Sequence, residues 1–138
     1  MQSTAAVDES SRWTEALAAI GLGEDIPAPA PDLALFFVTP GYPEMDHLVA
    51  ETYRRSAASV LVGCTGGGVI GTGREIEGRK AVSILNLSLP GTAFQPRHVE
   101  MDDLGALQSS EACQQWIGLS PDELNAFVIF ADPFTFDT

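Results

Sequence analysis

Residues 59–89, SVLVGCTGGGVIGTGREIEGRKAVSILNLSL, decide the fold of this chain. The stretch begins with the short apolar run 59–64, passes through a glycine-rich segment, and ends in the apolar run 81–89. Short apolar runs rich in β-branched residues and bounded by glycine clusters are typical of strands. Because the gap before the second run permits only a hairpin, we expect residues 69–77 to pair antiparallel with 81–89.

A second predicted unit lies immediately upstream. The run LALFFV at residues 33–38 lies between two proline-containing segments and predicts a strand buried on both faces. Residues 43–58 predict a helix, and the strand at 59–64 follows it. Strand, helix and strand over this length predict a parallel pair with a right-handed crossover. Together with the hairpin, this predicts an α/β fold with a mixed parallel and antiparallel sheet flanked by helices. The expected inner face of the helix consists of Met45, Leu48, Val49, Thr52 and Tyr53.

The N-terminal part predicts a tail and a helix. Residues 1–9 are polar and are expected to be disordered, so the domain is expected to span residues 10–138. A helix is predicted from there to about residue 22, with Ser10 and Ser11 as N-caps. Residues 26–31 alternate proline with small residues and predict an extended connector. The apolar stripe of the helix consists of Trp13, Ala16, Leu17 and Ile20.

The segment after residue 89 has weaker patterns. Phe134 and Phe136 lie near the end of the chain, where aromatic side chains need covering, so we expect a domain truncated at its C-terminal side. The predicted elements are a strand or edge at 93–99, helix within 101–119, a helix start at Ser120 and Pro121, and a last buried strand at 126–131.

Composition and charge exclude several classes of function. The 138 residues suffice for one domain, and a hydrophobic content of 45% supports a core. The net charge of −12 repels phosphates and anionic lipid headgroups, so neither nucleic acid nor a membrane is an expected partner. The sequence has no secretory signal pattern and no apolar stretch of membrane-spanning length, which predicts a cytoplasmic protein. Cys64 and Cys113 belong to no metal-ligand motif, so free thiols and no metal are expected.

The glycine-rich segment is the candidate binding loop. Glycine lets the main chain approach a ligand closely, and consecutive N–H groups can form an anion-binding nest. A tight structural connection between strands is the alternative, and the sequence leaves both open. The spacing of Gly66, Gly68 and Gly71 matches the dinucleotide fingerprint, but a hairpin follows instead of a helix, and no Walker A lysine is present. We therefore expect no cofactor.

Side chains around this loop offer candidate chemistry. Cys64 ends a predicted parallel strand, where α/β proteins commonly place ligands. A nucleophilic thiol needs a base such as His47 or His98 nearby, and a small apolar filler is the simpler interpretation. Glu75 and Glu77 share one face of an extended segment. They form either a carboxylate pair that binds an amine or a solvated hairpin surface.

Long segments of the chain resemble the N-terminal domain of the FIST family, whose name stands for F-box and intracellular signal transduction. The resemblance covers most of residues 10–136. The segments that carry it are GCTGGGVIG at 63–71, GREIEG at 73–78, AVSILNLSLPG at 81–91, DLALFFV at 32–38 and FVIFADPF at 127–134.

This resemblance implies a sensory domain of signal transduction rather than an enzyme. It implies a small ligand, described for the family as an amino acid or a derivative. It also implies a partner that reads the ligand state, either an output domain in a C-terminal FIST part or a separate signalling protein. A more typical family loop reads GCSTAG, where this chain has GCTGGG at 63–68. The candidate ligand-binding residues are Cys64, Thr65, Gly66, Gly67, Gly68 and Glu75.

Two alternatives to the sensor remain open. The first is an enzyme that uses Cys64 as a nucleophile. The second is an interaction scaffold that binds no small ligand.

Overall fold

The computed structural model describes residues 1–23 and 29–131, and it divides the chain into two compact units. The first unit spans Met1–Pro96 and the second spans Arg97–Thr138. The predicted connector at 26–31 lies partly outside the described residues, and Phe134 and Phe136 lie wholly outside them.

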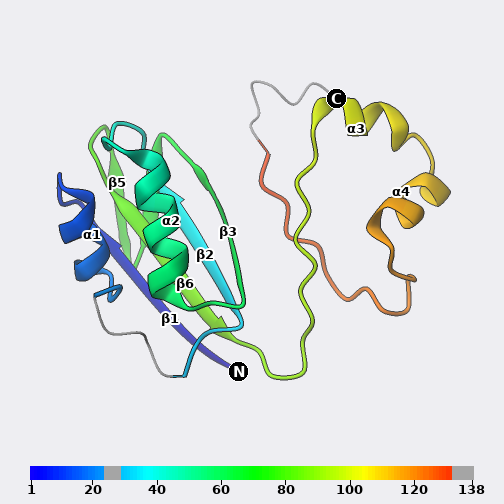
Figure 1. Cartoon of the computed structure of the whole chain (residues 1–138), viewed down its shortest axis with the longest axis horizontal. Coiled ribbons are helices and arrows are strands. Elements are labelled where there is room, and N and C mark those ends of the chain that lie inside the picture. Colours follow the sequence, from blue (N-terminus) through cyan, green and yellow to red (C-terminus); the bar gives the residue numbers. More distant parts are fainter. Residues whose placement is uncertain (24–28, 132–138) are drawn as a thin grey trace. The chain divides into compact units, whose positions relative to one another are not determined.

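A mixed four-stranded sheet forms the centre of the first unit (Figure 1). Its order is β1 (Gln2–Asp8), β6 (Val82–Ser88), β2 (Leu33–Val38) and β3 (Val60–Thr65). β2 and β3 are parallel, whereas β6 is antiparallel to both β1 and β2. This confirms the predicted α/β fold with a mixed sheet. The two most apolar strands, β2 and β6, are the central ones, because only a central strand buries both faces.

Two helices cover one face of this sheet, α1 (Trp13–Ala19) and α2 (Met45–Ser56) (Figure 1). Alternate residues of the strands face them, so Phe36 of β2 and Ile84 of β6 share a register position and are both buried. The buried core cluster consists of Ala16, Leu17, Ile20, Leu22, Ala34, Phe36, Val38, Tyr42, Leu48, Ala58, Val82 and Ile84.

The inner face of α2 is narrower than its apolar pattern predicts. Leu48, Thr52 and Ser56 are fully buried at i, i+4 and i+8, whereas Val49 and Tyr53 are 44% and 55% exposed. Two predicted inner residues are therefore on the solvent side. The small hydroxyl side chains reach the core because Thr52 Oγ1 donates to the Leu48 carbonyl at 2.7 Å and Ser56 Oγ donates to the Tyr53 carbonyl at 3.0 Å. Each polar atom thus enters the core already satisfied.

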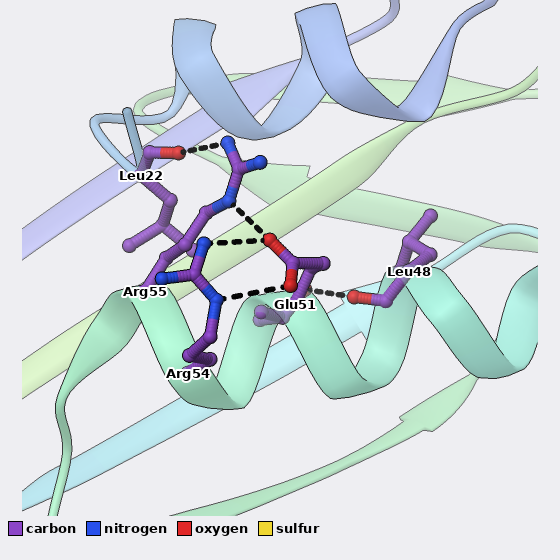
Figure 2. A network of polar contacts seen from close by, with 6 residues as sticks. Leu22, Leu48, Glu51, Arg54 and Arg55 are labelled. Carbon is purple, nitrogen blue, oxygen red and sulfur yellow. Dashed lines mark hydrogen bonds and ion pairs between the residues drawn. The ribbon is translucent and has the colours of Figure 1, made fainter. Parts of the chain in front are cut away.

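Charged residues on α2 connect it to the end of α1. Figure 2 shows that Arg54 and Arg55 both contact the carboxylate of Glu51. The shortest nitrogen–oxygen distance is 2.8 Å for each arginine. Arg55 also donates to the carbonyl oxygen of Leu22 at 3.3 Å. The hydrogen bonds from Arg54 and Arg55 lower the pKa of Glu51 to about 2, well below its ordinary range. The network fixes the chain just after α1 against α2.

The predicted caps of α1 are wrong. Its N-cap residue is Arg12, which makes no capping side-chain hydrogen bond. The main chain at Ser10 serves another purpose, since its amide donates to Asp8 Oδ1 at 2.7 Å and its carbonyl accepts from the Tyr42 hydroxyl at 2.8 Å. The turn between β1 and α1 therefore uses this serine to join the two elements to the core.

The N-terminal residues contradict the prediction of disorder. Residues 2–8 form β1, which pairs antiparallel with β6 from Gln2 opposite Ser88 to Asp8 opposite Val82. Their polar and small side chains do not show the apolar pattern of a strand. An edge strand gains its stability from backbone hydrogen bonds more than from its own apolar side chains.

The predicted hairpin between 69–77 and 81–89 is also wrong. Residues 68–77 instead fold on themselves as β4 (Gly68–Gly71) and β5 (Arg74–Glu77). Thr72 and Gly73 both have positive φ, 49° and 75°, as a two-residue hairpin turn of type I′ requires. β6 has no free edge for this segment because β1 and β2 occupy both of its sides.

The second unit contains α3 (Met101–Ala106) and α4 (Ser110–Ile117), which confirms the predicted helical content of 101–119. The other predictions for the segment after residue 89 are wrong. Residues 93–99 and 126–131 form no strand, and Ser120 begins a turn rather than a helix. An apolar run becomes a strand only where another strand completes its backbone ladder.

Candidate functional site

The glycine-rich segment begins in β3, crosses a two-residue loop and enters β4. Cys64 and Thr65 end β3, Gly66 and Gly67 form the loop, and Gly68 begins β4. Thr65 lies opposite Val38, the last residue of β2, and the Gly66 amide donates to the Val38 carbonyl at 3.1 Å. The loop therefore lies at the carboxyl end of the parallel pair, as the sequence predicted.

Several of these glycines meet a packing requirement. A Cβ at Gly63 would lie 1.7 Å from the carbonyl oxygen of Phe36. One at Gly68 would lie 2.7 Å from Glu77 Cγ, and one at Gly71 would lie 2.9 Å from Ser83 Oγ. A tight connection between strands accounts for these three positions.

Gly67 differs from its neighbours. Nothing lies within 4 Å of the place that its Cβ would take, and the residue is exposed. Cys64 and Thr65 beside it are exposed as well, whereas Gly66 and Gly68 are half-buried. The main chain at Gly67 is thus open to close approach from solvent.

The hairpin places Glu77, rather than Glu75, beside the loop. The register sets Glu77 opposite Gly68, while Glu75 lies opposite Ile70, two positions further along. Both glutamates are exposed on the outer face of β5, and Ile76 between them is buried. The sequence shows that the two carboxylates share a face, but their distance from the loop depends on the β4–β5 register, which the sequence did not predict.

The hairpin is anchored on the face of the sheet opposite α1 and α2. Val69 and Ile76 pack against Ala81, with Val7 and Phe37 half-buried beside them. Ser83 Oγ donates to the Ile70 carbonyl at 2.8 Å. These contacts fix the position of the loop relative to the sheet.

Comparison with protein families decides what kind of domain this is. The model of the FIST N domain matches residues 32–138, from the start of β2 through the glycine segment and the second unit. The chain belongs to the FIST N domain family. This is a family of signal-transduction domains. No curated protein and no solved structure matches the chain.

Within the first unit of this FIST N domain, Cys64 does not lie beside the predicted base His47. Leu61 faces the helices, so the alternation of β3 puts Cys64 on the opposite face. His47 belongs to α2, on the helix-covered side of the sheet, and His98 belongs to the second unit. Within residues 1–23 and 29–131, no group of three His, Cys, Asp or Glu side chains lies close enough to hold a metal ion.

Two ion pairs and one buried tyrosine hydroxyl contribute to the electrostatics of the first unit of this FIST N domain. Arg74 and Arg79 contact Glu9 at 3.2 and 3.0 Å and connect the hairpin to the end of β1. Burial, with a smaller contribution from the charge of Asp8, raises the pKa of Tyr42 to about 12. Sequence reasoning missed Glu9 because it assigned this residue to a disordered tail. The described part of the chain contains no helix that is both long and apolar enough to cross a membrane.

Proposed function

We propose that this FIST N domain is a sensor that binds a small molecule, an amino acid or a derivative of one, in signal transduction. The observation that carries the proposal is the open strand end, where exposed Cys64 and Thr65 meet the uncovered main chain of Gly67. Ligands of α/β proteins bind outside the carboxyl ends of parallel strands, which is where this loop lies.

The proposed ligand lies across residues Cys64, Thr65, Gly66, Gly67 and Gly68. Its carboxylate accepts hydrogen bonds from the main chain around Gly67 and from the Thr65 hydroxyl. Its ammonium group pairs with a carboxylate of β5, either Glu75 or Glu77, and the register favours Glu77. Because the Gly66 amide already donates to Val38, Gly67 carries the main-chain contribution.

Net charge selects among amino acids. The chain carries a net charge of −12, so a ligand with a net negative charge is repelled as it approaches, whereas a zwitterion with no net charge is not. We therefore expect neutral amino acids to bind more tightly than aspartate or glutamate.

The proposed output is a shift in population between the free and bound forms, which an output domain or a separate signalling protein reads in the cytoplasm. The ligand must bind one form better than the other for this to work. The proposed sensor does not include a nucleic-acid partner, a metal ion or a cofactor.

A thermal-shift screen of the twenty amino acids at millimolar concentration tests the proposal. A ligand at about 100 times its dissociation constant adds about 2.7 kcal/mol to stability, which such a screen detects. We expect Gly67→Val to abolish the shift, because a side chain there occupies the open approach and its Cβ meets no atom within 4 Å. Gly23→Val is the matched control, since a Cβ at Gly23 also meets no atom within 4 Å.

Two further variants separate the carboxylates. Glu77→Gln is expected to weaken binding more than Glu75→Gln. The absence of stabilisation by every amino acid, or equal stabilisation of wild type and Gly67→Val, would contradict the proposed site.

An interaction scaffold is a second candidate function. Three consecutive apolar side chains of the second unit, Phe127, Val128 and Ile129, are 59%, 66% and 78% exposed. Consecutive exposed apolar residues are a typical contact surface for another protein. If this is the function, the chain self-associates or binds a protein in sedimentation experiments, and Phe127→Ser with Ile129→Ser weakens that association.

A further inference from the structure

A second candidate site lies in the first unit, on the helix-covered side of the sheet. It is a hollow of about 250 Å³ between β1, β6 and the chain that leaves α1. Ala6 and Gly21 leave room there, and Gly21 has a φ of +86° where the chain turns out of the helix. Ile20 and Leu22 form an apolar wall, and Thr4 and Asn86 are its polar residues.

Asn86 has an unexplained polar atom. Its Oδ1 is buried, and it is the one buried side-chain nitrogen or oxygen without a hydrogen-bond partner among the residues that the structure describes. Native proteins rarely leave such an atom unpaired, so each instance indicates a missing partner or a function. Thr4 lies directly opposite Asn86 on β1, yet the Asn86 oxygen takes no hydrogen bond from it.

The apolar wall is held in place before any ligand arrives. The Leu22 amide donates to the Leu17 carbonyl at 2.8 Å, and the Leu22 carbonyl accepts from Arg55. Arg55 is itself held by Glu51, as Figure 2 shows. A preformed wall lowers the entropic cost of binding.

The lining selects the chemistry of the ligand. No charged side chain lines the hollow, so an ion would lose hydration without compensation. An apolar cavity of about 150 Å³ accepts benzene, so this hollow has room for a benzene ring with a small polar group. The Asn86 Oδ1 is buried as it stands, so the amide must rotate about its Cβ–Cγ bond to turn this acceptor toward the hollow, and the opposite orientation presents the donors. A ligand with both kinds of group, such as a primary amide, matches it best.

We propose that this hollow binds a small uncharged molecule with an apolar body and a primary amide, or an alcohol in its place, and that Asn86 is its polar anchor. The site is separate from the glycine loop and does not depend on the ligand proposed there.

Benzamide is the probe, and toluene is its apolar counterpart. Binding to the full chain is followed by ¹H–¹⁵N NMR, with the amides of Thr4, Ala6, Leu22 and Asn86 as reporters. We expect benzamide to shift these amides with at least tenfold higher affinity than toluene.

Asn86→Leu distinguishes binding from structure. It removes the unpaired acceptor, so we expect an unchanged or higher Tm together with at least tenfold weaker benzamide binding. Asn125→Leu, at an exposed asparagine, is the control and leaves both unchanged. Thr4 lies at an exposed position of β1 and lines the hollow, so the leucine of Thr4→Leu fills part of it. This variant is also expected to weaken benzamide binding at least tenfold.

Three outcomes would overturn the proposal. The first is the absence of benzamide-induced shifts at these amides. The second is equal affinity in wild type and both variants. The third is a lower Tm of Asn86→Leu with unchanged binding, which would mean that an ordered water satisfies Asn86 and that the atom has a purely structural role.

Discussion

Both units of the chain contain helices, but the units differ in what holds their helices in place. In the first unit, α1 and α2 place fully buried side chains such as Leu17 and Leu48 on the sheet. In the second unit, neither α3 nor α4 has a buried residue. The comparison separates helices that are stabilised by packing from helices that are specified by local sequence.

Local hydrogen bonds explain the helices of the second unit. Glu100 and Asp103 form a capping box on α3, and Ser109 Oγ accepts from the Ala112 amide at the start of α4. Gly118 ends α4 with a φ of +74°, the left-handed conformation that glycine adopts most easily. Such signals lie within a few residues of the sequence, whereas the first unit depends on partners far along the chain.

The largest expected effect comes from Gly63→Ala. The new Cβ would lie 1.7 Å from the Phe36 carbonyl oxygen, so β3 cannot keep its pairing with β2. We expect loss of the cooperative urea transition of the first unit. Gly67→Ala is the matched control and should change the midpoint little, since its Cβ meets no atom within 4 Å. Similar transitions for both variants would contradict the packing role of Gly63.

The next effect compares the two units directly. Leu48→Ala should lower the free energy of unfolding by about 2–5 kcal/mol, because it opens a cavity under α2. Leu104→Ala on half-exposed α3 should cost less than about 1 kcal/mol. Urea denaturation of both variants measures the difference. A larger loss for Leu104→Ala would reverse the comparison.

Tyr42→Phe tests a single long-range hydrogen bond. It removes the bond to the Ser10 carbonyl and should cost about 1 kcal/mol at neutral pH. The raised pKa of Tyr42 means that its contribution to stability is complete below about pH 10 and is lost as the pH rises through about 12.

The control for this prediction is the pH dependence of the variant. Tyr42→Phe should lack that alkaline loss when unfolding is followed by circular dichroism. An identical alkaline profile for wild type and variant would show that Tyr42 is not the titrating group.

The smallest expected effect on global unfolding comes from Ser109→Ala. Loss of the N-cap should destabilise α4 by about 1 kcal/mol and increase hydrogen exchange at the start of that helix. The urea midpoint of the first unit should stay unchanged. A shift of that midpoint would contradict the prediction, because it would show that α4 contributes to the stability of the first unit.

The sequence predicted those parts of the fold that depend on local pattern. The apolar runs of β2 and β3 and the helix between them gave the parallel pair correctly. The register of 68–77 was missed, because the decisive Thr72-Gly73 turn competes with a pairing to β6 that looks equally good in sequence. β1 was missed because its polar, small side chains carry no strand signal.

The sequence predicted where the glycine loop lies in the fold, but not which side chains lie beside it. The strand end at Cys64–Gly68 follows from the βαβ pattern. Glu77 beside Gly68 follows only from the hairpin register. The unpaired oxygen of Asn86 has no sequence signal, because it depends on side chains from β1 and from the end of α1.

The most direct test of the proposed sensor is a ¹H–¹⁵N NMR titration of the full chain with neutral amino acids, one at a time. The account predicts that at least one of them shifts the amides of residues 64–68 and of Glu77 in a saturable manner, and that Gly67→Val removes those shifts. Titrations that leave these amides unmoved at millimolar concentration for every amino acid would contradict it.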